Sequence, residues 1–132
     1  MPLRISRSTA LIVGIVLPCI ETWRRWHMLA DWAAWLDDYI AAVLLLYAWR
    51  VGRREASRSR PYLMAAWGYT FAMAYMSFFG QMKNLSADPS GMSNAVVAGF
   101  KGFGLALSGI CLALTWRSPT SPSSNGIRDG SS

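Results

Sequence analysis

The stretch that decides the fold lies near the end of the chain, where residues 94–116 are NAVVAGFKGFGLALSGICLALTW. Lys101 is the only charged residue in it. A helix needs about 20 predominantly apolar residues to cross the hydrocarbon of a bilayer, so this stretch predicts a transmembrane helix. Residues 61–82 contain no charge at all and predict a second one.

Two further apolar segments precede these, at about residues 8–23 and 29–51. The first follows two arginines and has no small-residue cleavage site after it, so we interpret it as an uncleaved signal anchor. The second is uninterrupted in its inner half, whereas Asp37 and Asp38 lie in its outer half. The sequence therefore predicts an all-α protein, a four-helix transmembrane bundle that occupies residues 1–117 as one domain.

The composition supports a membrane protein. The chain has 132 residues, of which 53% are hydrophobic and 15% are charged. Soluble domains usually have about 25% charged residues. The 7 Trp, 5 Tyr and 5 Phe residues also suit the membrane–water interface, where amphipathic rings gather. Membrane lipid is therefore the first partner that we expect.

The basic residues are concentrated in one short segment. The net charge is +6, and five arginines separate the second apolar segment from the third: Arg50, Arg53, Arg54, Arg58 and Arg60. Cytoplasmic loops are enriched in Lys and Arg, so this loop is a topology signal. It predicts that both chain ends lie in the cytoplasm, with residues 118–132 as a disordered polar tail. Because the loop joins two apolar segments, we expect no nucleic-acid partner.

An arrangement with three crossing helices remains an alternative. In it the first segment does not cross, and the N-terminal arm lies flat on the membrane surface. Four helices alternate between the two sides more simply. The brief loops and the arginine-rich flank suggest a multi-pass protein of the cell membrane, in the bacterial inner membrane.

The segment at 94–116 has three faces. Small residues repeat at alternating steps of four and three and form one stripe: Ala95, Gly99, Gly102, Ala106, Gly109 and Ala113. Small residues let two helix backbones approach closely in lipid, so this stripe predicts helix packing at a left-handed crossing of about 20°. Ala65, Gly68 and Ala72 of the preceding helix are the internal candidates for the partner.

The two remaining faces differ in polarity. One is large and apolar and suits lipid: Val96, Phe100, Phe103, Leu107, Ile110 and Leu114. The other is polar or small and is expected to face protein: Lys101, Gly104, Ser108, Cys111 and Thr115.

Four charged residues are expected at a similar depth. At a rise of about 1.5 Å per residue, counted from the flanking arginines, all four fall in the outer third of the membrane: Glu21, Asp37, Asp38 and Lys101. A charge inside a bilayer needs a partner or a role, so we expect Lys101 to pair with Asp37 or Asp38, with Glu21 nearby. In the alternative, the Lys101 side chain extends outward to the membrane–water interface. The aspartates then lie in a hydrated part of that interface, and the second helix is shorter.

The residues required for familiar chemistry are missing. His27 is the only histidine, and Cys19 and Cys111 are far apart in sequence, without the spacing of a metal site. We therefore expect no metal, no cofactor and no enzymatic activity.

Two functions follow as hypotheses. The first is a non-enzymatic subunit or scaffold, as a homo-oligomer or with another membrane protein, that packs through the helix at 94–116. The alternative is a small proton-coupled or cation transporter that uses the charge cluster. In size and helix count alone the chain resembles the small multidrug exporters, which work as dimers around a membrane-embedded glutamate. No motif matches, and Glu21 lies near the end of its helix rather than at mid-membrane.

Overall fold

The structure is a computed structural model that describes residues 2–25, 32–83 and 91–118. Within these residues the chain is all-helical, which confirms the predicted fold class, and it forms four α-helices. Their bounds are α1 (Pro2–Arg25), α2 (Trp32–Arg54), α3 (Ser59–Lys83) and α4 (Asn94–Trp116), with a 3-10 turn at Ala56–Arg58. The predicted tail lies outside the described residues from position 119 onward.

α4 has the predicted bounds, whereas α1 and α3 extend beyond the predicted segments at both ends and α2 extends beyond its segment at the C-terminal end. α1 begins at Pro2, because proline is tolerated at the first position of a helix, where its missing N–H leaves no bond unmade. α2 continues to Arg53 and Arg54, since cations are favourable at a helix C-terminus. Ser118, expected in the tail, is buried and donates a hydrogen bond to the carbonyl oxygen of Leu114 at 2.9 Å.

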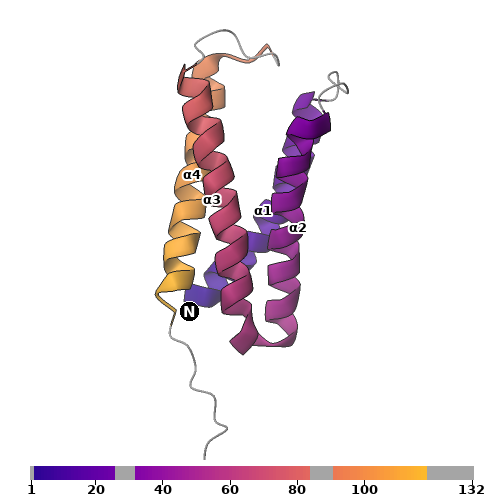
Figure 1. The fold of residues 1–132 in the computed structure, drawn as a ribbon, viewed down its shortest axis with the longest axis vertical. Coiled ribbons are helices and arrows are strands. Elements are labelled where there is room, and N and C mark those ends of the chain that lie inside the picture. The colour runs from indigo at the N-terminus through magenta and orange to yellow at the C-terminus, as the bar shows by residue number, and fades with distance from the viewer. Residues whose placement is uncertain (1, 26–31, 84–90, 119–132) are drawn as a thin grey trace, which may run out of the picture.

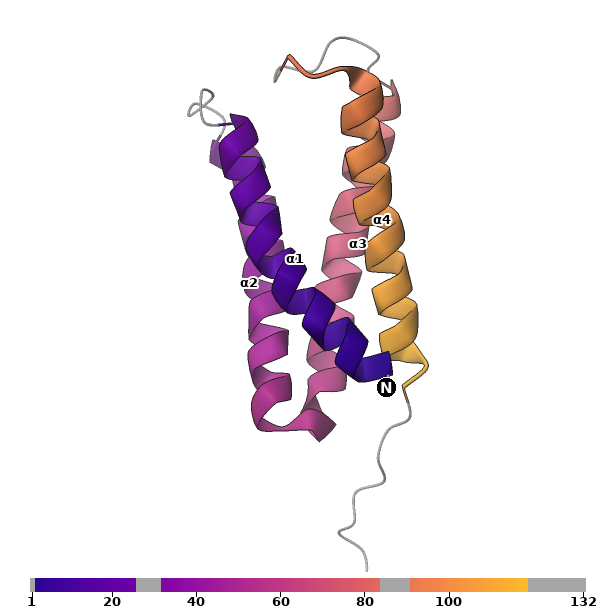
Figure 2. The ribbon, with the colours of Figure 1, turned by 180° about the vertical axis from the view of Figure 1, so that it is seen from behind.

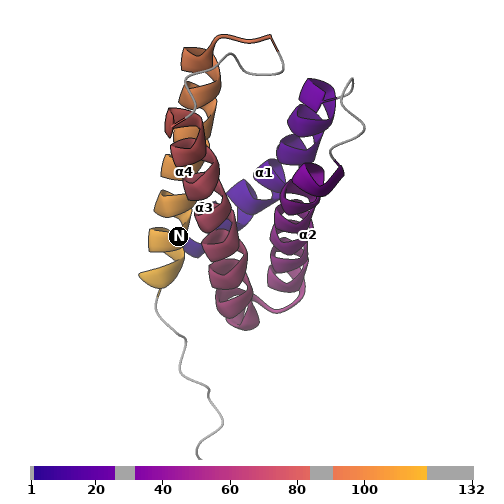
Figure 3. The same ribbon diagram turned by 45° about the horizontal axis from the view of Figure 1, so that its top comes forward.

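The four helices form two hairpins (Figure 1). α1 packs along α2 to form hairpin one, and α3 packs along α4 to form hairpin two. The hairpins meet at one end of the molecule and diverge toward the other, as the views in Figures 1, 2 and 3 all show. α2 contacts α3, and α1 crosses to reach α4, whereas in the described part of the chain α2 and α4 do not touch.

The two ends of the bundle are named here for their chemistry. The end where the hairpins meet is the basic end, because it carries the first turns of α1 and the turn between α2 and α3 (Figure 2). The opposite end, where the hairpins diverge, is the open end. The basic end holds most of the 13 Lys and Arg residues: Arg4, Arg7, Arg50, Arg53, Arg54, Arg58, Arg60 and Arg117.

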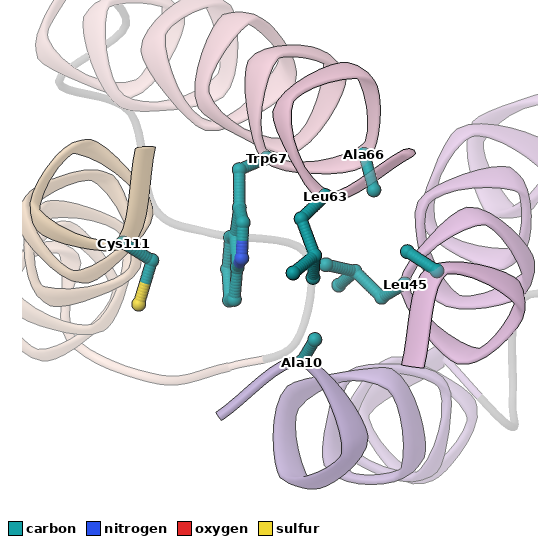
Figure 4. Close-up of a cluster of buried hydrophobic side chains, with 7 residues drawn as sticks. Ala10, Leu45, Leu63, Ala66, Trp67 and Cys111 are labelled. Atoms are coloured by element: carbon teal, nitrogen blue, oxygen red, sulfur yellow. The ribbon is translucent and has the colours of Figure 1, made fainter. Parts of the chain in front are cut away.

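The core is small and draws on all four helices (Figure 4). Trp67 of α3 is its largest member and is fully buried, beside Leu63 of the same helix and Leu45 of α2. Ala10 of α1 and Cys111 of α4 close it on the remaining sides. Trp67 belongs to hairpin two, and its cluster includes residues of α1 and α2 from hairpin one. The core therefore joins the two hairpins where they meet.

The outer surface is apolar over much of its area. Met76, Phe103 and Val43 expose 73%, 67% and 64% of their surface. Among the described residues, two helices, at Pro2–Trp23 and Asn94–Trp116, are long and apolar enough to cross a membrane. α2 carries two aspartates and a basic C-terminus, and α3 carries polar residues at both ends.

Candidate functional site

Lys101 contacts the other helix of its own hairpin. Its Nζ donates a hydrogen bond to Oε1 of Gln81 on α3 at 2.8 Å. The Gln81 amide in turn donates through Nε2 to Oδ1 of Asn94 at 3.2 Å. Gln81 and Lys101 both belong to hairpin two, whereas the aspartates lie on α2 of hairpin one. The pairing of Lys101 with Asp37 or Asp38 stays a prediction.

The three carboxylates of the predicted cluster all lie on hairpin one. Asp37 and, more weakly, Asp38 interact electrostatically with Tyr69 of α3. Glu21 is half-buried on α1, and the next residue, Thr22, shares a hydrogen bond of 2.8 Å with the Tyr39 hydroxyl of α2. The carboxylates of the predicted cluster therefore lie on hairpin one and its lysine on hairpin two, and the interaction with Tyr69 shows that the aspartates face α3.

α3 covers only part of the small-residue stripe of α4. A Cβ atom added at Gly102 would lie 3.2 Å from the Phe78 ring, and one added at Gly109 would lie 3.2 Å from the Phe71 ring. α3 is therefore the internal partner, as predicted, but it contacts these glycines through phenylalanines rather than through its small residues Ala65, Gly68 and Ala72. A flat ring fills the space that each missing side chain leaves.

The rest of the stripe faces outward. Its remaining members are exposed and are called the open edge of α4: Ala95, Gly99, Ala106 and Ala113. A Cβ atom added at Gly99 would meet no other atom within 4 Å. This edge can therefore accept another helix backbone at short distance without any rearrangement of the chain.

Most residues of the other two faces of α4 lie as predicted, but Leu107, expected to face lipid, is partly buried against the core. Ser108, Cys111 and Thr115 on the polar face are buried. Phe100, Phe103 and Ile110 on the large apolar face are exposed. The burial pattern confirms which face packs against the protein and which one points outward.

A buried chain of hydrogen bonds connects three helices beside the core. Trp67 Nε1 donates to Ser6 Oγ at 2.9 Å, and Ser6 Oγ lies 2.7 Å from Thr115 Oγ1. Thr115 uses its own hydrogen on the Cys111 carbonyl oxygen at 2.7 Å, so Ser6 must be the donor to Thr115. Trp67 Nε1, Ser6 Oγ and Thr115 Oγ1 each have a hydrogen-bond partner in this network, which avoids the penalty of an unmade bond.

Two arginines cap the C-termini of helices other than their own and are called the capping arginines. Arg7 of α1 donates through Nη1 to the carbonyl oxygen of Gly52, near the end of α2. Arg60 of α3 donates through Nη2 to the carbonyl oxygen of Trp116, at the end of α4, at 2.7 Å. The last carbonyls of a helix lack partners within it, and a cation there is favourable. Arg60, assigned to topology alone by the sequence, therefore also has a structural role.

Sequence reasoning predicted neither the hydrogen bond between Ser6 and Thr115 nor the contacts of the capping arginines. A hydroxyl in an apolar segment is a usable signal that a hydrogen bond is needed there, but it does not identify the partner. No family model, curated protein or solved structure matches this chain. The function is therefore argued from the geometry of these contacts.

Proposed function

We propose that this chain is a small integral membrane protein that acts as a non-enzymatic subunit or scaffold. In this proposal it binds a second transmembrane helix through the open edge of α4. The observation that carries the proposal is the open position at Gly99, next to positions on the same stripe that α3 already covers. The second helix belongs to another copy of this chain or to another membrane protein.

The exposed apolar surface supports membrane insertion. Large apolar side chains lie outward on each hairpin, including Val43 on α2 and Phe103 on α4. In water, contiguous apolar surface of this kind promotes association, whereas in a bilayer the acyl chains cover it. We propose that all four helices cross, with the basic end in the cytoplasm of a bacterial cell and both termini on that side.

The alternative function as a transporter requires Lys101 and the carboxylates to share one site. Lys101 bonds to Gln81 within hairpin two, and the carboxylates lie on hairpin one. We prefer the first function because the open position at Gly99 supports it.

A reporter fusion tests the membrane arrangement. Alkaline phosphatase is active only outside the cytoplasm, so a fusion after Met28, beyond α1, is expected to be active. A matched fusion after Glu55, between α2 and α3, is expected to be inactive because the basic end stays inside. An inactive fusion at Met28 would show that α1 does not cross, and would favour the three-helix arrangement.

A leucine at Gly99 tests the binding edge. Cys19 is exposed and Cys111 is buried, so copies can be labelled at Cys19 with a donor or an acceptor fluorophore. We expect energy transfer between differently labelled copies in liposomes, and we expect Gly99→Leu to abolish it by separating the two backbones. Circular dichroism and thermal stability should stay unchanged, since the added side chain starts in open space.

Gly80→Leu is the matched control. Gly80 is also exposed, and a Cβ atom added there also meets nothing within 4 Å, but it lies on α3. This variant should retain energy transfer. Equal loss in both variants, or undiminished transfer in Gly99→Leu, would exclude the open edge as the surface of self-association.

A further inference from the structure

The arginines of the basic end differ in what their side chains contact. The capping arginines bond helix ends, and Arg58 pairs with Glu55 at 2.9 Å. Arg53 lies over the Trp49 ring, 5.3 Å from its centroid. Four other arginines are exposed and are called the outer arginines: Arg4, Arg50, Arg54 and Arg117. The first group already makes contacts within the chain, so the outer arginines are the ones that we consider for a partner.

The charge at this end is strongly one-sided. The outer arginines come from three helices, α1, α2 and α4, and the fold brings the corresponding helix ends together at the basic end (Figures 1 and 2). In the described part of the chain, Glu55 is the only acidic residue at this end, and Arg58 already pairs with it. The surface therefore attracts anions over its whole width rather than at one point.

Aromatic side chains surround the same end. Trp116 is 66% exposed at the end of α4, and Trp49 lies beneath Arg53 on α2. Tyr47 and Tyr62 meet edge to face with ring centroids 5.6 Å apart, which joins α2 to α3 just inside the arginines. Trp and Tyr gather at the depth of lipid headgroups, so this combination fits a membrane interface.

A nucleic acid would neutralise the arginines but would leave the adjoining apolar surface exposed. That surface continues from Tyr47 to Val43 on α2 and from Trp116 to Ile110 on α4. A leaflet of anionic phospholipid covers both, because its acyl chains meet the apolar side chains and its phosphates meet the guanidinium groups. Arginine binds phosphate with a planar pair of N–H donors.

We propose that the outer arginines form a docking surface for anionic phospholipid headgroups of the cytoplasmic leaflet. The proposal rests on the proposed membrane function and adds the class of lipid that the protein binds. Juxtamembrane Lys and Arg residues are attracted to anionic headgroups, and the attraction falls with salt. The structure adds that only a subset of the arginines takes part.

Lipid titration tests the proposal. The purified full chain in neutral maltoside detergent is titrated with short-chain phosphatidylglycerol, or with phosphatidylcholine of equal chain length, and bound lipid is counted by native mass spectrometry. We expect tighter binding of phosphatidylglycerol, and a drop of roughly tenfold or more in its affinity in the Arg50→Gln/Arg54→Gln double variant. Both side chains are exposed, so thermal stability without lipid should not change.

Lys83→Gln is the control, because it removes an exposed positive charge at the open end and should keep the preference. Equal affinity for the two lipids, or an undiminished preference in the double variant, overturns the proposal. Displacement of phosphatidylglycerol by an equal concentration of glycerol phosphate, or by an RNA oligonucleotide, also overturns it by identifying a free phosphate or a nucleic acid as the ligand. An inactive reporter at Met28 contradicts the four-helix membrane arrangement separately, so the two failures can be told apart.

Discussion

Replacing Trp67 with alanine is expected to lower the free energy of unfolding by about 3–5 kcal/mol. Trp67 is fully buried where the two hairpins meet, and it touches core residues from the other helices (Figure 4). Its removal leaves a cavity that the surrounding helices cannot close without moving. It also leaves the Ser6 hydroxyl without its donor. Thermal and denaturant unfolding of the purified protein in detergent, followed by circular dichroism, measures the change.

Trp116→Ala is the matched control for this prediction. The substitution removes the same side chain, but from a position that is 66% exposed, and only the backbone of Trp116 bonds to Arg60. Its effect in detergent should stay within about 0.5 kcal/mol. Similar losses in both variants would mean that the centre of the bundle is not as tightly packed as the structure indicates.

Trp67→Phe separates packing from hydrogen bonding. Phenylalanine retains much of the apolar volume but cannot donate to Ser6. We expect an intermediate loss, and we expect it to shrink when Ser6 is already alanine, because the bond is then absent from both members of the comparison.

The helices of the fold could be predicted from the sequence because their signals are local. The stretch at 94–116 shows which face of α4 is polar and which is large and apolar, since helical periodicity determines both faces. Burial of Ser108 and exposure of Phe103 agree with that pattern. Helix ends were less predictable, because Pro2 and Arg54 are polar or helix-breaking residues that end effects accommodate.

The charge cluster shows what the sequence cannot determine. Counting residues gives the depth of a side chain, but not the distance between the helices that carry it. Lys101 and Asp37 share a similar expected depth but lie on different hairpins, and residue counting does not give the distance between those hairpins. Gln81, which accepts a hydrogen bond from Lys101, is an uncharged residue near the end of α3 and gave no signal as a partner.

The small-residue stripe had the same limit. Its six members repeat regularly, and the sequence predicts close packing along all of them. The structure places rings of α3 on Gly102 and Gly109 but leaves Gly99 open, because a phenylalanine covers one side of the stripe only. Whether a stripe residue contacts α3 or stays open therefore depends on which residues of α3 face α4. That is a feature of the tertiary structure, which the local sequence pattern does not contain.

Gly52→Ala is the second substitution with a large expected effect. We expect it to lower the free energy of unfolding, although helix propensity alone predicts an increase. Alanine is favoured over glycine within a helix by about 1 kcal/mol. At Gly52, however, the new Cβ would lie 2.7 Å from Arg7 Cδ and 2.9 Å from Ser59 Cβ. Ser59 is fully buried and cannot swing away, and movement of Arg7 would break its bond to the Gly52 carbonyl. We expect a net loss of about 1–2 kcal/mol, measured by unfolding in detergent.

Gly68→Ala supplies the comparison, because a Cβ atom at Gly68 meets nothing within 4 Å. There the propensity acts alone, and the variant should gain up to about 1 kcal/mol. Opposite signs at the two glycines are thus the expected result. A gain at both would mean that α1, α2 and α3 do not converge at Gly52, and that Arg7 does not cap α2. The close approach at Gly52 and the capping arginine are one feature, since only a glycine leaves room for the Arg7 side chain to reach the carbonyl.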